Sequence, residues 1–129
     1  MKNEGDKILI IDDDPGIGEM LKTLLEFNGY EVLVSDKPLQ AKDTIMQYRP
    51  DVILLDVRLS GVDGTEVCAG FKQDEEIKDV PVLMMSALTG ADKTCKNAGA
   101  DGFISKPFEM EDLLEKIENQ LSKAQNKNS

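Results

Sequence analysis

The chain of 129 residues contains no histidine, only two cysteines and no long hydrophobic run. Without histidine it cannot carry a Ser-His-Asp triad, a His-ligated zinc site or a phosphohistidine of its own. Its apolar runs, such as Ile8–Ile11, are far too short to span a bilayer, and the polar N-terminus lacks the apolar segment of a signal peptide. We therefore expect a cytoplasmic protein without membrane insertion.

Basic residues are also scarce, because 15 Lys and Arg stand against 25 Asp and Glu, which gives a net charge of −10. This charge argues against duplex DNA or an anionic membrane as the main partner. The two cysteines, Cys68 and Cys95, show no CxxC spacing. One disulfide is formally possible, but we favour two small buried apolar residues in a reducing cytosol.

Short apolar runs alternate along the chain with longer segments of helical period. The pattern predicts strands over Lys7–Ile11, Glu31–Val34, Asp51–Leu55, Val80–Met85 and Gly102–Ser105. It predicts helices over Pro15 to about Asn28, Pro38 to about Tyr48, Val67–Lys72, Ala91–Asn97 and Met110–Leu121. Such alternation is typical of an α/β, doubly wound parallel sheet covered by helices on both faces. We expect a single domain over residues 1–129, with a core of about 7–121 and a polar tail over 122–129.

Polar side chains follow each of the five predicted strands at the point where functional groups gather in such folds, although the second strand is followed only by Ser35 and Asp36. Asp12, Asp13 and Asp14 follow the first strand, Asp56 the third, and Ser86 the fourth, while Lys106 follows the fifth across Ser105. Each of these alone is typical of an ordinary solvated loop. Because parallel strands end at one edge of the sheet, we expect all of them to converge there.

This combination indicates phosphoryl chemistry. Clustered carboxylates repel one another unless a cation holds them, and a site with few oxygen ligands from protein suits Mg²⁺. Lys106 and Ser86 could then neutralise and hydrogen-bond the oxygens of a phosphoryl group. Asp56 could attack phosphorus directly and form an aspartyl phosphate.

Three competing motifs fail on the residues present. An EF-hand that begins at Asp12 would need Gly at position 17 and Glu at position 23, where Ile17 and Thr23 stand. Gly16 and Gly18 lack the third glycine of a dinucleotide fingerprint, because Leu21 occupies that position. The chain also has no Gly-x-x-x-x-Gly-Lys-Ser/Thr phosphate loop.

From about Lys7 to Leu121 the chain closely resembles the receiver domain of two-component response regulators. The resemblance rests on five separated pieces in the right order, at residues 8–15, 50–56, 63–64, 85–87 and 99–108. It implies a flavodoxin-like sheet of five strands in the order 2-1-3-4-5, with five helices. The chain departs from the common pattern at Leu59 and Ser60, where the family often has Met-Pro, and at Phe103, where tyrosine is common.

The resemblance also implies specific roles. Asp56 matches the phosphoacceptor, Asp12 and Asp13 match the acidic pair that positions Mg²⁺, and the backbone carbonyl of Arg58 matches the metal's main-chain ligand. Asp14 matches a commonly acidic third position. Ser86 and Lys106 match the residues that hold the phosphoryl group, and Phe103 matches an aromatic switch position. The Lys106–Pro107 bond matches a cis peptide of the family.

The function implied is a phosphoacceptor module that takes a phosphoryl group from a phosphohistidine on a sensor histidine kinase or histidine phosphotransfer protein. It would then switch the surface of the fifth strand and its flanking helices, 91–97 and 110–121, to control a downstream target protein. We expect no enzyme beyond self-phosphorylation and self-dephosphorylation, and a receiver that stands alone or is excised from a longer regulator. Alternatives are a binding module that acts without phosphorylation and an aspartyl-phosphate phosphatase, which wants an acid where Arg58 stands.

Overall fold

Five parallel strands form the centre of the molecule. The computed structural model describes residues 5–59 and 61–127. Its main sheet contains β1 (Lys7–Ile11), β2 (Glu31–Ser35), β3 (Val52–Asp56), β6 (Val82–Ser86) and β7 (Gly102–Ser105). They lie in the order β2-β1-β3-β6-β7, and every pairing is parallel. The predicted fold class and strand order are confirmed, since β6 and β7 are the fourth and fifth strands of this sheet.

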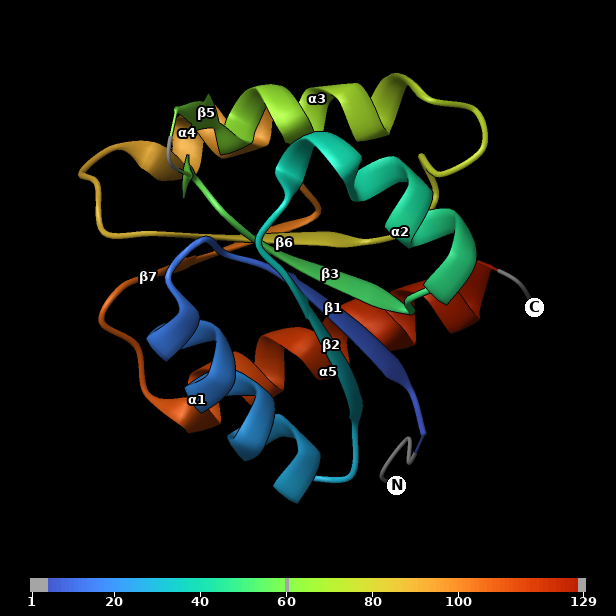
Figure 1. Cartoon of the computed structure of the whole chain (residues 1–129), viewed down its shortest axis with the longest axis vertical. Coiled ribbons are helices and arrows are strands. Elements are labelled where there is room, and N and C mark those ends of the chain that lie inside the picture. The colour runs from blue at the N-terminus through green and yellow to red at the C-terminus, as the bar shows by residue number, and fades with distance from the viewer. Residues whose placement is uncertain (1–4, 60, 128–129) are drawn as a thin grey trace.

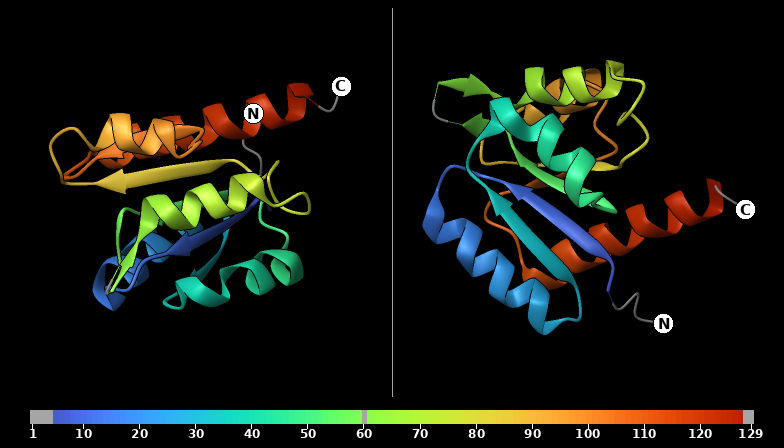
Figure 2. Two further views of the ribbon diagram at one scale, coloured as in Figure 1. Left: turned by 90° about the horizontal axis from the view of Figure 1, so that it is seen from above. Right: turned by 45° about the vertical axis from the view of Figure 1, so that its right-hand side comes forward.

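Helices cover both faces of the sheet (Figures 1 and 2). On one face lie α1 (Pro15–Phe27) and α5 (Met110–Lys127), and on the other lie α2 (Ala41–Tyr48), α3 (Gly64–Gln73) and α4 (Ala91–Asn97). Side chains of a strand point alternately to the two faces. Ile8 and Ile10 of β1 accordingly join the core beneath α1 and α5, whereas Leu9 and Ile11 join the opposite core. Continuous apolar runs therefore become strands that are buried on both sides.

Short polar side chains start two of the helices that border the carboxyl edge of the sheet. Asp14 caps α1, because its Oδ1 accepts hydrogen bonds from the backbone N–H groups of Gly16 and Ile17 at 2.9 and 3.3 Å. Asp63 caps α3 by accepting from Thr65 N at 2.9 Å. Both caps satisfy N–H groups that a helix leaves unpaired at its first turn, so they fix where each helix leaves the edge.

The structure differs from the predicted elements in several places, and the second and third strands each end one residue later than predicted. The fourth strand begins at Val82 rather than Val80, because Pro81 has no N–H to donate to the sheet. The helix predicted from Pro38 opens with a 3-10 turn, η1 (Pro38–Gln40), before α2. The third helix begins at Gly64 rather than Val67. The loop before it contains a small antiparallel hairpin of β4 (Arg58–Leu59) and β5 (Val62–Asp63).

The last helix is the largest correction. It continues to Lys127, past its predicted end at Leu121, so residues 122–127 of the expected polar tail are helical. Within residues 110–123 of α5, whose burial is described, Leu121 is the last to join the apolar core. No Pro or Gly follows it, and the Lys, Ala and Gln beyond are good helix formers, so the helix continues past Leu121.

The two ends of the described chain lie at the same edge of the sheet. β1 starts at Lys7 on the amino edge, and α5 runs back from Met110 near the carboxyl edge to Lys127 (Figure 2). Within residues 5–59 and 61–127, no helix is both long enough and apolar enough to cross a membrane. The carboxyl edge lies at the opposite end of the strands and carries the polar side chains described next.

Candidate functional site

The carboxyl edge of the sheet brings together the residues predicted from strand ends. Asp12 follows β1, Asp56 ends β3, Ser86 ends β6, and Lys106 follows β7. The register fixes their spacing, because Asp56 is paired with Met85 and Ser86 with Ser105 on neighbouring strands. Side chains separated by up to 94 positions in the sequence therefore share one small region.

Lys106 links the carboxylates at the ends of β1 and β3. Its Nζ donates to Asp56 Oδ2 at 2.7 Å and lies 3.9 Å from Asp12 Oδ2. The Lys106 backbone N–H also donates to Ser86 O at 2.8 Å, which fixes the start of the chain after β7. The Lys106–Pro107 peptide is cis, as the resemblance implied. One ammonium group thus faces two carboxylates.

Asp12 is almost completely buried, with 1% of its surface exposed. Its Oδ1 accepts from Asp14 N at 2.9 Å, while its buried Oδ2 accepts no hydrogen bond from the described residues. Burial raises the pKa of Asp12, and the neighbouring Asp56 raises it further, although the Asp14 N–H and Lys106 act in the opposite direction. A buried oxygen without a donor, beside a second carboxylate, is a natural ligand for a cation.

Asp56 is also largely buried, and both of its oxygens are engaged. Oδ1 accepts from Arg58 N at 3.0 Å, and Oδ2 accepts from Lys106. The chain after it is held from two sides, since Val57 N donates to Met85 O at 3.0 Å and Gly64 N donates to Val57 O at 2.7 Å. The position of the Asp56 carboxylate is therefore defined by its neighbours before any ligand binds.

The three consecutive aspartates have different surroundings. Asp12 points into the buried cluster, and Asp13 lines an open hollow together with Arg58, Leu88 and the β4–β5 hairpin. Asp14 is exposed and serves as the N-cap of α1. The structure thus places Asp12 and Asp13 at the site and gives Asp14 a local role in starting a helix.

Ser86 is the last residue of β6, and Phe103 lies in β7, the neighbouring strand of the sheet. Ser86 is buried, and its Oγ accepts from Leu88 N at 2.9 Å. Phe103 on β7 is half-buried and packs against the core beneath α2, α3 and α4. Phe103 therefore shares a hydrophobic core with Cys95 of α4.

The donor set fits a hard divalent cation that keeps several waters. Over residues 5–59 and 61–127, no three acidic or cysteine side chains are grouped closely enough to form a metal cage by themselves. Mg²⁺ usually binds to only one or two protein carboxylates and completes its shell with water and ligand oxygens. The orphaned Asp12 Oδ2 and the adjacent carboxylate match that requirement.

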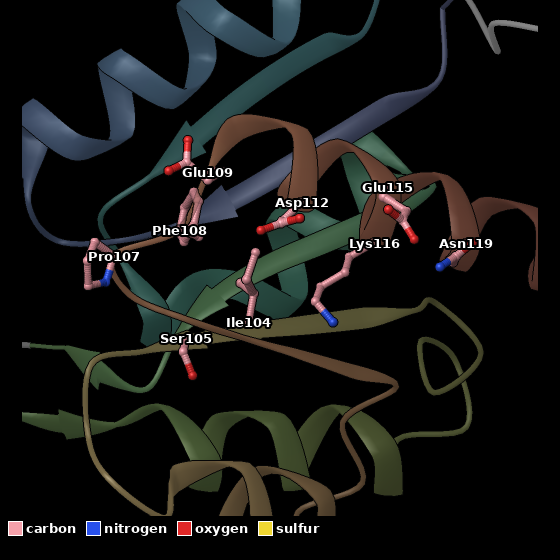
Figure 3. A pocket seen from close by; sticks show the side chains of 9 residues that line it. All are labelled: Ile104, Ser105, Pro107, Phe108, Glu109, Asp112, Glu115, Lys116 and Asn119. Carbon is pink, nitrogen blue, oxygen red and sulfur yellow. The ribbon is translucent and has the colours of Figure 1, made fainter.

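A separate cavity lies between β7 and α5 (Figure 3). Ile104 and Phe108 contribute apolar surface to it, and Asp112 lies above Ile104 in this view. The acidic side chains Glu109 and Glu115 also line it, together with Lys116 and Asn119. This cavity belongs to the surface of β7 and α5 that the resemblance implied as a switching surface.

Two residues at the site carry no direct chemical signal in the sequence. Leu88 lines the hollow beside Asp13, and Gly64 packs against the main chain of Asp56 and Val57. An Asp-Gly pair before a helix is a weak cue to a tight approach, whereas nothing in the sequence distinguishes Leu88 from any surface leucine. Gly64 closes the loop after β3, and Leu88 lies in the loop after β6.

Residues 8–118 match the family described as "Response regulator receiver domain". Among the relatives, the DNA-binding dual master transcriptional regulator RpaA of Synechocystis sp. is 38% identical over 113 residues, which cover 86% of this chain and 47% of RpaA. The phosphate regulon transcriptional regulatory protein PhoB of Pseudomonas aeruginosa is 38% identical over 115 residues, which cover 88% of this chain and 50% of PhoB. The chain thus spans about half the length of these relatives.

Solved structures agree with this grouping. A response regulator from Chloroflexus aurantiacus superposes with a TM-score of 0.86 at 33% identity, and the match covers 92% of this chain and 99% of that one. The Vibrio cholerae chemotaxis protein CheY4 superposes with a TM-score of 0.83 at 30% identity, covering 91% and 99% of the two chains. The match over most of the chain, in sequence and in fold, shows that it belongs to the response regulator receiver domain family.

Proposed function

We propose that this receiver domain takes a phosphoryl group from a phosphohistidine onto Asp56 in a Mg²⁺-dependent reaction and thereby changes its affinity for a partner. The observation that carries this proposal is the convergence of Lys106 on Asp56 and Asp12 at one sheet edge. In the reaction, an oxygen of Asp56 forms a bond to phosphorus as the bond from phosphorus to the imidazole nitrogen breaks. Because the other ring nitrogen of the phosphohistidine carries a proton, the imidazole leaves as the neutral ring.

The residues of the site have separate tasks in this reaction. Lys106, now on Asp56 Oδ2, would move to a phosphoryl oxygen and neutralise its charge. Ser86 accepts from Leu88 N through its oxygen, so its hydroxyl proton can be donated to a second phosphoryl oxygen. The Arg58 N–H holds Asp56 Oδ1, which leaves the other oxygen to attack.

Mg²⁺ would be held by Asp12, Asp13, Asp56 and the backbone carbonyl of Arg58, and when bound it offsets the charge that accumulates on the phosphoryl oxygens. Asp12 contributes its buried Oδ2, which accepts no hydrogen bond from the described residues. Without the cation, the carboxylates of Asp12 and Asp56 repel the incoming phosphoryl group. We therefore expect phosphorylation to require Mg²⁺.

The exposed face of α1 suits the docking of the protein that carries the phosphohistidine. Met20, Leu24 and Phe27 are 51, 39 and 87% exposed, and their spacing places them along one side of the helix. α1 starts at Pro15, directly after the acidic residues, so a protein on this face lies beside Asp56. We propose that a sensor histidine kinase or a histidine phosphotransfer protein packs there.

The output would pass through β7 and its flanking helices. Phe103 lies on β7, two positions before Ser105, which is paired with Ser86. A movement of Ser86 towards the phosphoryl group would change the packing around Phe103 and α4. The surface of α4, β7 and α5, including the cavity of Figure 3, would then present a different face to a downstream target protein.

The test is direct phosphorylation by a small donor. With Mg²⁺ and acetyl phosphate, the wild-type chain should form an adduct that is labile to hydroxylamine, and Asp56→Asn should form none. Asp36→Asn serves as the matched control, because Asp36 is exposed and follows β2 at the same edge of the sheet. An adduct of equal yield in Asp56→Asn would refute the assignment of the acceptor.

A further inference from the structure

Gly64, the first residue of α3, lies against the main chain that follows Asp56. A Cβ atom at this position would overlap Asp56 O and would lie 2.8 Å from Val57 Cα and 2.9 Å from Val57 O. These are backbone atoms, which cannot swing aside as the end of a flexible side chain can. Any side chain at position 64 must therefore displace the peptide between Asp56 and Val57.

This contact closes the base of the β4–β5 hairpin. Gly64 N donates to Val57 O at 2.7 Å, and Val57 N donates to Met85 O at 3.0 Å on the neighbouring strand. The hairpin leaves this point at Arg58 and returns to it at Asp63, which caps α3. The position of the whole loop is thus set by how closely α3 approaches the end of β3.

The backbone conformation does not by itself demand glycine at this position. Among the described glycines, Gly5, Gly29, Gly61, Gly90 and Gly99 have positive φ angles, and Gly64 is not one of them. Gly70 of the same helix has no atom within 4 Å of the place where its Cβ would lie. The requirement at position 64 is therefore one of contact distance, and Gly70 offers a matched control within α3.

We propose that Gly64 is a positioning residue for the cation of the phosphorylation site. Its missing side chain lets α3 press on the Asp56–Val57 peptide, which places the Asp56 carboxylate and the Arg58 carbonyl for a shared cation. This inference rests on the proposed function, because the cation is the one required for phosphoryl transfer. It adds a residue that touches neither the cation nor the phosphoryl group.

The experiment compares Gly64→Ala with Gly70→Ala and Cys68→Ala by the rise in melting temperature on titration with MgCl₂. Cys68 is buried in the same helix, and its thiol donates to Ala98 O rather than to the main chain after Asp56, so Cys68→Ala is the control for a loss of core packing. We expect the Mg²⁺ midpoint of Gly64→Ala to rise at least about 10-fold. The two controls should keep the wild-type midpoint, and the half-saturating Mg²⁺ for phosphorylation should shift in parallel.

A wild-type midpoint in Gly64→Ala, or an equal shift in Cys68→Ala, would overturn the positioning role and leave the proposed function intact. A wild-type chain that shows no response to Mg²⁺ would overturn both. If Gly64→Ala does not fold, Asp63→Ala is compared with Asp63→Asn, since both remove the charge but Asn still caps α3. A several-fold higher midpoint in Asp63→Ala supports the proposal, and equal midpoints contradict it.

Discussion

Asp12 lowers the stability of the folded chain at neutral pH, and the same carboxylate supplies an oxygen to the site. Its carboxylate is buried, and one of its oxygens accepts no hydrogen bond from the described residues. Its raised pKa means that the folded chain holds the proton of this group more tightly than the unfolded chain does. The stabilisation from protonated Asp12 is thus present at low pH and is lost as the pH rises through the raised pKa.

Asp12→Asn should therefore stabilise the cation-free protein at pH 7, by about 1 kcal/mol in the free energy of unfolding. The amide keeps an oxygen for Asp14 N but no longer buries a charge beside Asp56. Urea unfolding without Mg²⁺ measures this gain, and melting with Mg²⁺ should show that the variant has lost its response to the cation. A less stable variant would contradict this interpretation of Asp12. Asp36→Asn should change neither quantity.

Lys106→Met should separate cation binding from phosphoryl transfer. The ammonium group now occupies Asp56 Oδ2 and faces Asp12, so its removal should lower the Mg²⁺ midpoint in a melting titration. The phosphorylation rate with acetyl phosphate should nevertheless fall about 100-fold, because a charge that stabilises the transferred group is gone. Lys93→Met, at an exposed position of α4, is the control for a general loss of charge. Weaker Mg²⁺ binding in Lys106→Met would show that Lys106 does not compete for the carboxylates.

At the scale of an element, α1 combines two functions on two sides. On its buried side, Leu21 and Leu25 pack in the core between this helix and the sheet. On its other side, Met20, Leu24 and Phe27 face outwards. An exposed apolar stripe contributes little to the stability of the fold, so its use is better sought in a partner. Its place next to the acidic site favours the donor of the phosphoryl group.

The double variant Leu24→Gln and Phe27→Gln should slow phosphotransfer from an autophosphorylated sensor histidine kinase of the same organism at least about 10-fold. Its rate with acetyl phosphate should stay at the wild-type value, since a small donor needs no docking surface. Leu39→Gln, which changes an 85% exposed leucine outside α1, is the control. Equal slowing with both donors would mean that the stripe acts on the site itself.

At the scale of the whole molecule, the two cysteines test how firmly α3 and α4 are packed. Both are free and completely buried, as the sequence predicted. Burial raises the pKa of the Cys68 thiol to about 11 and raises that of Cys95 as well. Reactive thiolate is therefore scarce at neutral pH in the folded chain.

With the thiol reagent DTNB at pH 8, the native protein should react slowly at both positions, and in urea both should react at once. The rate in the native state measures the opening of the helices. A native rate close to the urea rate at either cysteine would show that α3 or α4 is not packed as described. Cys68→Ala and Cys95→Ala assign the signal to one position.

The sequence was sufficient to predict the elements whose residues bury continuous apolar runs. Lys7–Ile11 and Gly102–Ser105 are strands at the predicted bounds, and parallel topology then placed Asp56 and Lys106 at one edge. The β4–β5 hairpin escaped prediction because two-residue strands carry no periodicity. The length of α5 escaped because a polar helix end lacks an apolar stripe. Ser60 lies outside the described residues.

The close approach at Gly64 was also beyond the sequence, because it depends on a contact with the main chain of β3. A glycine in a helix most often signals flexibility or a helix end rather than a distance. For Asp14 the sequence suggested more than the structure supports. It follows Asp12 and Asp13 directly, yet in the structure it caps α1. Local chemistry predicts which residue types meet at the edge, and packing decides which of them take part.

The two ends of the described chain lie on the amino edge of the sheet, across the molecule from Asp56. A fusion partner, a fluorescent reporter or a surface tether joined at either end would therefore leave the entrance to the acceptor open. An immobilised chain should accept phosphoryl groups as fast as the free one, whichever end is anchored. The same geometry makes this fold convenient for engineered cassettes in which one receiver is exchanged for another.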